Sequence, residues 1–194
     1  VCAAHRGRLD DEDRELHLDI EHTFDDVPRP DVLLVPGGCT PARIPDAYQP
    51  VIDWIRGAHE HTTYTTSVCT GSLLLGAAGL LDGLRATTHW RSYERLRGYG
   101  AEPTAQRVVA EGKIITGAGV SAGIDLALTV VAALQGAEAA QAIQLQIEYD
   151  PQPPFDTGAP AKASAPIRAL ADAITARTDG DARRRLWPDG RGYA

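Results

Sequence analysis

A cysteine stands where a strand-like segment passes directly into a helix-like segment, and this junction restricts the folds open to the chain. Residues 62–68 are mostly β-branched or aromatic and predict a strand, whereas 73–79 are small and apolar and predict a short buried helix. Cys69 lies between them, with Ser67 two positions before it and Gly71 two positions after it. Small residues there allow the sharp turn of a nucleophile elbow. The pattern therefore predicts an α/β fold with Cys69 at a strand–helix turn.

The place of Cys69 also favours a reactive thiol. The first turn of a helix presents N–H groups without intrahelical partners and the positive end of the helix dipole. Such surroundings stabilise the thiolate, which is the nucleophilic form of cysteine. Unpaired cysteines are otherwise most often small buried apolar residues, and this is the expectation for Cys2 and Cys39, which lack the strand-to-helix context. Cys69 is the candidate nucleophile.

Composition excludes several classes of protein. The chain has 194 residues and a net charge of −7, which argues against a nucleic-acid surface because phosphate binding requires clustered Lys and Arg. Its three cysteines are far apart and form no CxxC pair, so they predict neither a disulfide framework nor a metal site. No run approaches the roughly 18 apolar residues of a membrane span, and no signal peptide opens the chain. We expect a cytoplasmic protein with one α/β domain over 1–178 and a loose tail over 179–194.

Strand-like and helix-like segments alternate along the chain. Strands are predicted near 16–20, 31–35, 62–68 and 85–88, with a hairpin over 108–116, and helices near 47–61, 73–79, 93–96, 123–134 and 138–148. This order predicts a sandwich with a mostly parallel sheet. The continuous apolar run 31–35 is typical of a parallel strand covered on both faces.

Three groups of residues follow the carboxyl ends of predicted strands. They are the glycine pair Gly37 and Gly38, Cys69, and His89. Reactive groups gather at these ends in α/β sheets, and two successive glycines let the backbone approach a ligand closely. The convergence predicts an enzyme acting on a small molecule.

The motifs at these positions resemble those of the ThiJ/PfpI superfamily, whose fold is that of class I glutamine amidotransferases. The resemblance runs from about 31 to 160, and its motifs lie at 35–38, 67–72, 79–83 and 86–90. Segments 116–125, 144–149 and 153–160 are similar to the isonitrile hydratase branch. The resemblance implies a flavodoxin-like three-layer sandwich, a homodimer, and chemistry that needs no cofactor or metal.

The resemblance also implies a reaction, the addition of water to an isonitrile to give an N-substituted formamide. Cys69 would attack the terminal carbon to form a thioimidate, which water then resolves. N–H groups around Gly38 and Thr70 would hold developing negative charge or the attacking water, and the Thr70 hydroxyl would position that water. His89 would either hydrogen-bond near the thiolate or cap the following helix. The expected catalytic residues are Cys69, Thr70 and His89, and those expected to border the substrate are Gly37, Gly38 and Gly71.

Two departures from the superfamily matter. Thr70 follows Cys69 where peptidase-like branches have a histidine, which weakens a protease interpretation. The superfamily also places an acidic residue, the general acid or base, in the loop after its first strand. No such strand and loop are recognisable here, so we expect the first strand to be missing and the neighbouring strand to be exposed.

Other functions remain open from the sequence. The same fold precedes helix-turn-helix domains in transcription regulators, so the chain is alternatively a sensor domain. It is alternatively a glyoxalase- or deglycase-type hydrolase with the same cysteine, or an inactive remnant. The segment 153–160 favours the hydratase, and pocket shape decides between the enzyme classes.

Overall fold

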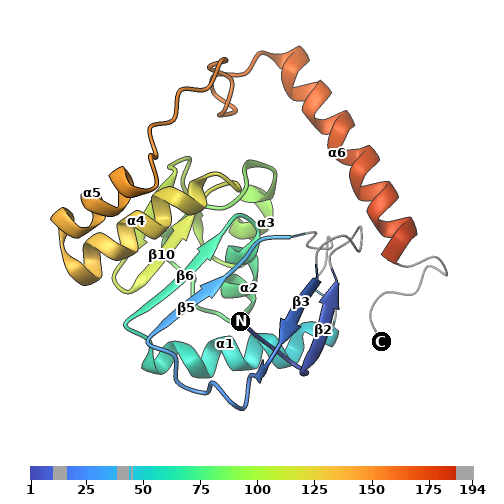
Figure 1. Ribbon diagram of the computed structural model, residues 1–194. Helices are drawn as coiled ribbons and strands as arrows, with labels where there is room; N and C mark the ends of the chain where they lie inside the picture. Colours follow the sequence, from blue (N-terminus) through green and yellow to red (C-terminus); the bar gives the residue numbers. More distant parts are fainter. Residues whose placement is uncertain (11–16, 39–43, 45, 187–194) are drawn as a thin grey trace. The chain divides into compact units, whose positions relative to one another are not determined.

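The computed structural model describes residues 1–10, 17–38, 44 and 46–186 (Figure 1). The chain forms two compact units, one made of Val1–Thr23 with Asp150–Ala194 and the other of Phe24–Tyr149. The second unit contains the central sheet and the predicted site residues described below. Cys39 lies outside the described residues.

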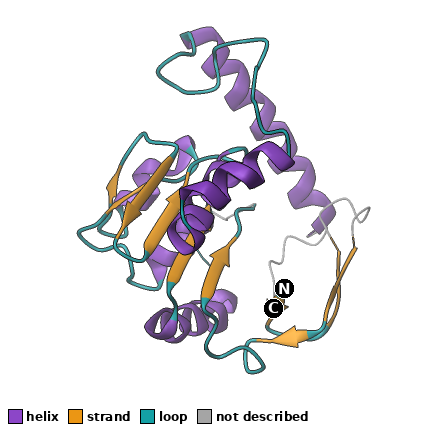
Figure 2. Ribbon diagram, turned by 60° about the vertical axis from the view of Figure 1, so that its left-hand side comes forward, coloured by secondary structure: helices purple, strands orange, loops and turns teal. Residues whose placement is uncertain are grey.

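A four-stranded sheet forms the centre of the second unit. Its strands are β5 (Val32–Val35), β6 (Tyr64–Val68), β10 (Ile114–Gly117) and β9 (Val108–Glu111), in the order β5-β6-β10-β9. The first three are parallel, and β9 runs antiparallel to β10, as the predicted hairpin requires. Figure 2 shows these strands as neighbouring arrows with helices around them. The predicted α/β class with a mostly parallel sheet is confirmed.

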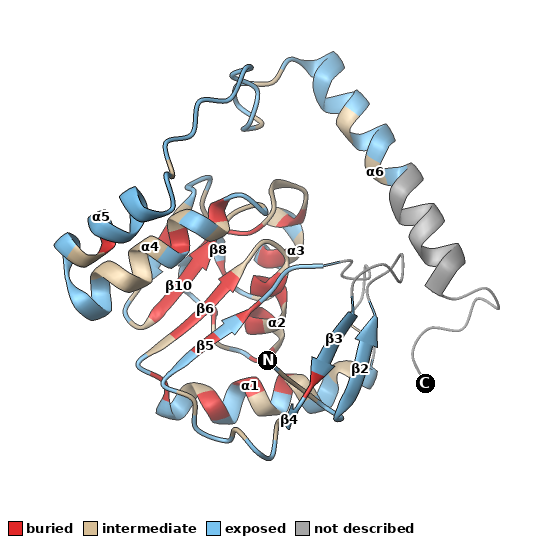
Figure 3. Cartoon of the chain, in the orientation of Figure 1, coloured by how far each residue is buried: buried red, intermediate tan, exposed pale blue. Residues whose placement is uncertain are grey.

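Helices cover both faces of this sheet. Leu33 and Val35 of β5 point into a core formed with α1 (Gln49–His61) and α2 (Gly71–Ala77). On the other face, α4 (Ala122–Gln135) packs against β10 and β6. The approach is close, since a Cβ on Gly117 of β10 would lie 3.2 Å from Leu126 Cδ1. Figure 3 shows the buried residues concentrated along the strands and the helix sides facing them. The arrangement has the three layers that the sequence predicts.

Strand β5 departs from the prediction that both of its faces are covered. Leu33 and Val35 are each 5% exposed, whereas Val32 and Leu34 are 38% and 53% exposed. Successive side chains of a strand point to opposite faces, so one face of β5 is packed and the other is open to solvent. The apolar run alone could not distinguish a strand covered on both faces from one covered on a single face.

The second unit has further elements outside the four-stranded sheet. They are η1 (Asp46–Tyr48), β7 (Arg85–Ala86), η2 (Trp90–Ser92), α3 (Tyr93–Arg97), β8 (Glu102–Pro103) and α5 (Ala137–Gln146). The strand predicted at 85–88 ends at Ala86 and pairs with β8 in a two-stranded sheet. Thr87 and Thr88 are thereby left outside regular structure, and both are fully buried.

The first unit contains two pairs of short strands and a long helix. Strand β1 (Cys2–Ala3) pairs with β4 (His22–Thr23), and β2 (Gly7–Asp10) pairs with β3 (His17–Ile20). The strand predicted near 16–20 is therefore present, within a two-stranded sheet of its own.

Helix α6 (Ala165–Leu186) is the last described element of the first unit. The segment 179–194, for which the sequence predicts a loose tail, begins inside this helix, and 187–194 lie outside the described residues. Throughout the described part of the chain, no helix is both long and apolar enough to cross a membrane.

Candidate active site

The turn at Cys69 has the sharp geometry that its small neighbours predict. Strand β6 ends at Val68 and helix α2 begins at Gly71. Cys69 has a φ of 57°, in the left-handed region that residues other than glycine seldom adopt. Its side chain is partly exposed. Strained backbone of this kind persists only where surrounding contacts hold it, and it concentrates at functional sites.

Four hydrogen bonds hold the backbone of Cys69. Its N–H donates to the carbonyl oxygens of Gly117 at 3.0 Å and Ala118 at 2.7 Å. Its carbonyl oxygen accepts from the hydroxyls of Thr88 at 2.9 Å and Ser72 at 3.1 Å. A left-handed residue costs on the order of 1–3 kcal/mol, and these bonds offset that cost. The elbow is thus fixed by the ends of β10 and of the 85–88 segment as well as by its own helix.

Two of the predicted glycines are explained by close packing at the end of β5. A Cβ built on Gly37 would lie 2.6 Å from Cys69 Cβ and 3.2 Å from its Sγ. A Cβ on Gly71 would lie 2.2 Å from the Val35 carbonyl oxygen. Distances below 3.0 Å are not tolerated without a shift, so each position requires glycine. Gly37 borders the thiol directly, whereas Gly71 faces the backbone of β5.

Thr70 and Gly38 are joined by two hydrogen bonds. The N–H of Gly38 donates to Thr70 Oγ1 at 3.0 Å, and the Thr70 hydroxyl donates to the Gly38 carbonyl oxygen at 2.9 Å. These bonds tie the loop after β5 to the start of α2. The two groups expected to bind a water or a developing negative charge are therefore partners in this conformation. A hydroxyl oxygen has two acceptor positions, so Thr70 Oγ1 retains one for a water.

His89 lies beside the elbow. It directly follows Thr88, which bonds to the Cys69 carbonyl oxygen, and its Cδ2 is 3.4 Å from the position of a Cβ on Gly119. Its own carbonyl oxygen accepts from the Ser92 N–H at 2.8 Å and so begins η2. Burial lowers the pKa of the ring, and the charge of Arg91 acts in the same direction. Burial therefore favours the neutral form of the ring, which has one nitrogen free to accept a proton.

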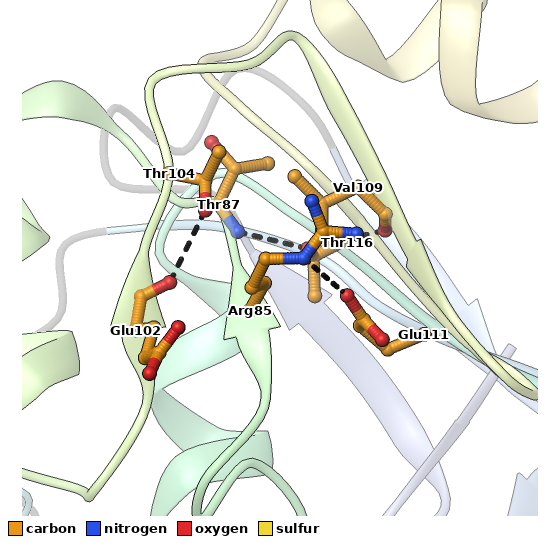
Figure 4. A network of polar contacts seen from close by, with 7 residues as sticks. All are labelled: Arg85, Thr87, Glu102, Thr104, Val109, Glu111 and Thr116. Atoms are coloured by element: carbon orange, nitrogen blue, oxygen red, sulfur yellow. Dashed lines mark hydrogen bonds and ion pairs between the residues drawn. The ribbon is translucent and has the colours of Figure 1, made fainter.

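A hydrogen-bonded network connects the 85–88 segment to the hairpin (Figure 4). The Thr87 N–H donates to Thr116 Oγ1 at 2.9 Å, inside the core. At the surface, Arg85 Nε and Glu111 Oε1 form an ion pair at 2.6 Å between β7 and β9. The buried bond holds the backbone next to Thr88, while the exposed pair contributes little because solvent screens it.

Thr88 and Ala118 hold the Cys69 backbone, and the sequence alone assigns no role to either residue. Thr88 could have been suspected from its place beside His89 after a predicted strand. Among the residues that the structure describes, no carboxylate bonds to the Cys69 thiol or the His89 ring. Within the same residues, no group of three or more His, Cys, Asp and Glu side chains is placed to hold a metal ion.

Comparison with known proteins shows which family and which relatives this chain resembles. The DJ-1/PfpI family model matches residues 3–133. The chain is 50% identical over 145 residues to the isonitrile hydratase of Pseudomonas putida, covering 75% of this chain and 63% of that protein. It is 34% identical over 119 residues to the HTH-type transcriptional regulator CdhR of Pseudomonas aeruginosa, covering 60% of this chain and 34% of that one. The chain thus spans less than two thirds of the length of either curated relative.

A solved structure extends the likeness to most of the chain. The crystal structure of a ThiJ/PfpI family protein from Pseudomonas syringae superposes with a TM-score of 0.81 at 36% identity, covering 95% of this chain and 76% of that one. An AraC family transcriptional regulator from Pseudomonas putida, at 21% identity and a TM-score of 0.64, shares the fold. The resemblance stated from the motifs is confirmed, and this chain belongs to the DJ-1/PfpI family.

Proposed function

We propose that the protein adds water to an isonitrile to give an N-substituted formamide, with Cys69 as the nucleophile. The observation that carries this proposal is the 50% identity to an isonitrile hydratase over 145 residues. The elbow supports it independently, because Cys69 is held in a left-handed conformation at the start of α2. A reactive side chain on such a turn is presented to a substrate rather than packed into the core.

The chemistry balances with Cys69 and one water. Sγ forms a bond to the terminal carbon of R–N≡C, and that carbon takes up the proton that the thiol gives up, leaving the thioimidate R–N=CH–S. Water then adds to the same carbon, and the C–S bond breaks. The nitrogen and the sulfur each end with one proton, so the products are R–NH–CHO and the free thiol.

The neighbours of Cys69 have distinct parts in this proposal. Thr70 uses its remaining acceptor position to orient the water that resolves the thioimidate. His89, neutral because burial lowers its pKa, relays a proton between water and nitrogen. Gly37 leaves room for the substrate carbon to approach Sγ, since any side chain there would meet the thiol. Gly71 lets the start of α2 approach the end of β5, and the backbone of Gly38 holds the Thr70 hydroxyl in place.

Formamide production from cyclohexyl isocyanide tests the proposal. The wild-type protein is expected to release N-cyclohexylformamide, and Cys69→Ala is expected to release none above the uncatalysed rate. Cys2→Ala is the matched control, because Cys2 lies in the other unit. Full activity in Cys69→Ala would exclude nucleophilic catalysis by this residue.

A sensor domain is the second candidate, and the likeness to CdhR favours it. A sensor would bind a small molecule at the elbow without turning it over. Binding of an isonitrile that leaves no formamide and no covalent mass on Cys69 would support the sensor. The deglycase-type alternative predicts instead that glyoxal is consumed while isonitriles are not.

A further inference from the structure

A series of backbone hydrogen bonds starts at the Cys69 N–H, whereas Thr88 bonds to the Cys69 carbonyl oxygen. The Cys69 N–H donates to the Ala118 carbonyl oxygen, and the Ala118 N–H donates to the Arg107 carbonyl oxygen at 2.9 Å. Gly117, Ala118 and Gly119 have no side chain long enough to anchor this loop. Gly117 is the last residue of β10 and is held by the sheet, whereas the direction of the Ala118 carbonyl group depends in part on what holds Arg107.

The Arg107 side chain is held at the start of α4. Its Nε donates to Asp125 Oδ2 at 2.7 Å and its Nη2 donates to Ser121 Oγ at 3.1 Å. Asp125 lies in the first turn of α4, where the helix dipole favours a negative charge. A planar guanidinium that makes two bonds has a defined orientation, which a single point charge lacks. The backbone of Arg107 is thus fixed to α4.

Tyr149 also hydrogen-bonds to Asp125. Its hydroxyl donates to the same Oδ2 atom at 3.0 Å, and Gln144 Nε2 donates to the Tyr149 carbonyl oxygen at 3.2 Å. Glu148 has a φ of 52°, so the chain turns sharply just before Tyr149. This second left-handed residue returns Tyr149 toward α4 after α5 ends. The carboxylate of Asp125 consequently has a single orientation toward Arg107.

We propose that Arg107 is a positioning residue for Cys69. Its pair with Asp125, oriented by Tyr149, fixes Ala118 just after β10 and hence the carbonyl group that receives the shorter of the two bonds from the Cys69 N–H. Loss of the pair lets the backbone at Ala118 relax, and Cys69 then leaves its left-handed conformation part of the time. The proposal rests on Cys69 being the nucleophile, but it does not depend on which substrate Cys69 attacks.

Alkylation of Cys69 by iodoacetamide at neutral pH tests the proposal without an isonitrile. Arg107→Gln is expected to slow Cys69 alkylation about fivefold, because the thiol is displaced from the start of α2. Arg107→Lys is expected to recover part of the rate, since it keeps the charge but not the second bond. Where turnover is measurable, kcat is expected to fall while KM stays unchanged.

Arg85→Gln is the matched control. Arg85 and Glu111 form a similar surface pair at 2.6 Å, with exposures of 55% and 27% against 49% and 31% for Arg107 and Asp125 (Figure 4). Both Arg→Gln variants are expected to change the melting temperature by a similarly small amount, because both pairs are exposed, but only Arg107→Gln should slow alkylation. The proposal is overturned if Arg107→Gln alkylates at the wild-type rate or if Arg85→Gln slows it equally. A wild type that is alkylated at Cys69 but makes no formamide would reject the proposed reaction and leave this inference standing.

Tyr149→Phe distinguishes a coupled cluster from independent contacts. Tyr149→Phe alone should slow alkylation of Cys69. In a double variant with Arg107→Gln it should cause no further slowing, because Tyr149 affects Cys69 only through Asp125 and Arg107. Equal effects in the two backgrounds would contradict the proposed route.

Discussion

The hydroxyl of Thr88 donates to the carbonyl oxygen of Cys69 at 2.9 Å, which joins two segments 19 residues apart in the sequence. Thr88 is fully buried, and it lies beside His89, the only predicted site residue in its segment. Together with the Ser72 hydroxyl it fixes the peptide that follows Cys69. The left-handed conformation of Cys69 is therefore a property of the tertiary structure.

Replacing Thr88 by valine should destabilise the elbow. Thr88→Val keeps the shape but removes the donor, so the free energy of unfolding is expected to fall by about 1 kcal/mol, and Cys69 alkylation should slow. Urea unfolding and timed iodoacetamide labelling measure the two effects. Thr104→Val is the control, because the Thr104 hydroxyl makes a longer bond of 3.3 Å to Glu102 away from the elbow. Equal labelling rates in the two variants would contradict a role for Thr88.

A methyl group at Gly37 should impair the site more than it impairs the fold. The new Cβ would lie 2.6 Å from Cys69 Cβ, so the thiol must move. We expect Gly37→Ala to lower turnover about 10- to 100-fold, measured as formamide release. Gly57→Ala is the control, since Gly57 lies in α1 with nothing within 4 Å of the added Cβ. The Gly57→Ala variant should gain about 0.5–1 kcal/mol of stability. A wild-type rate of formamide release by Gly37→Ala would show that the protein relieves the crowding at the thiol.

Cys69 should be the first cysteine to react. Burial raises the pKa of the Cys2 thiol, which keeps Cys2 in the less reactive thiol form near neutral pH. Limited iodoacetamide treatment at pH 6 to 7, read by peptide mass spectrometry, is expected to modify Cys69 ahead of Cys2 and Cys39. Earlier modification of either other cysteine would count against the elbow.

His89 should contribute to a loss of stability in acid. Burial lowers its folded-state pKa below the ordinary value of 6.5, so the folded protein binds the proton less readily than the unfolded chain does. Its contribution is therefore complete above pH 6.5 and is lost as the pH falls toward the folded-state pKa. His89→Gln should reduce the difference in unfolding free energy between pH 7.5 and 5.5. His59→Gln is the comparison. Burial lowers the pKa of His59 as well, and its Nδ1 hydrogen-bonds to the Thr65 hydroxyl, at the end of β6 far from Cys69. An unchanged difference in His89→Gln would show that its ring titrates normally.

The local elements were predictable because each depends on residues close in sequence. Local patterns identified β6, the elbow, α1 and α4. They are the β-branched residues over 62–68, the small residues around Cys69, the apolar face of 47–61 and the apolar run of 123–134. The hairpin over 108–116 followed from the Glu111-Gly112 turn. The motifs also identified the family, since the same residue types recur at strand ends where chemistry takes place.

Contacts between distant segments decided the rest. Thr88 and Ala118 act on Cys69 through atoms that meet only when β6, β10 and the 85–88 segment are assembled. The open face of β5 follows from where the helices pack, which the apolar run 31–35 does not encode. Sequence by itself determined where a sharp turn could form and which thiol it would present. Only the tertiary structure decided how that turn is held, because three of the four hydrogen bonds that offset the strain of a left-handed cysteine come from residues 19 to 49 positions away.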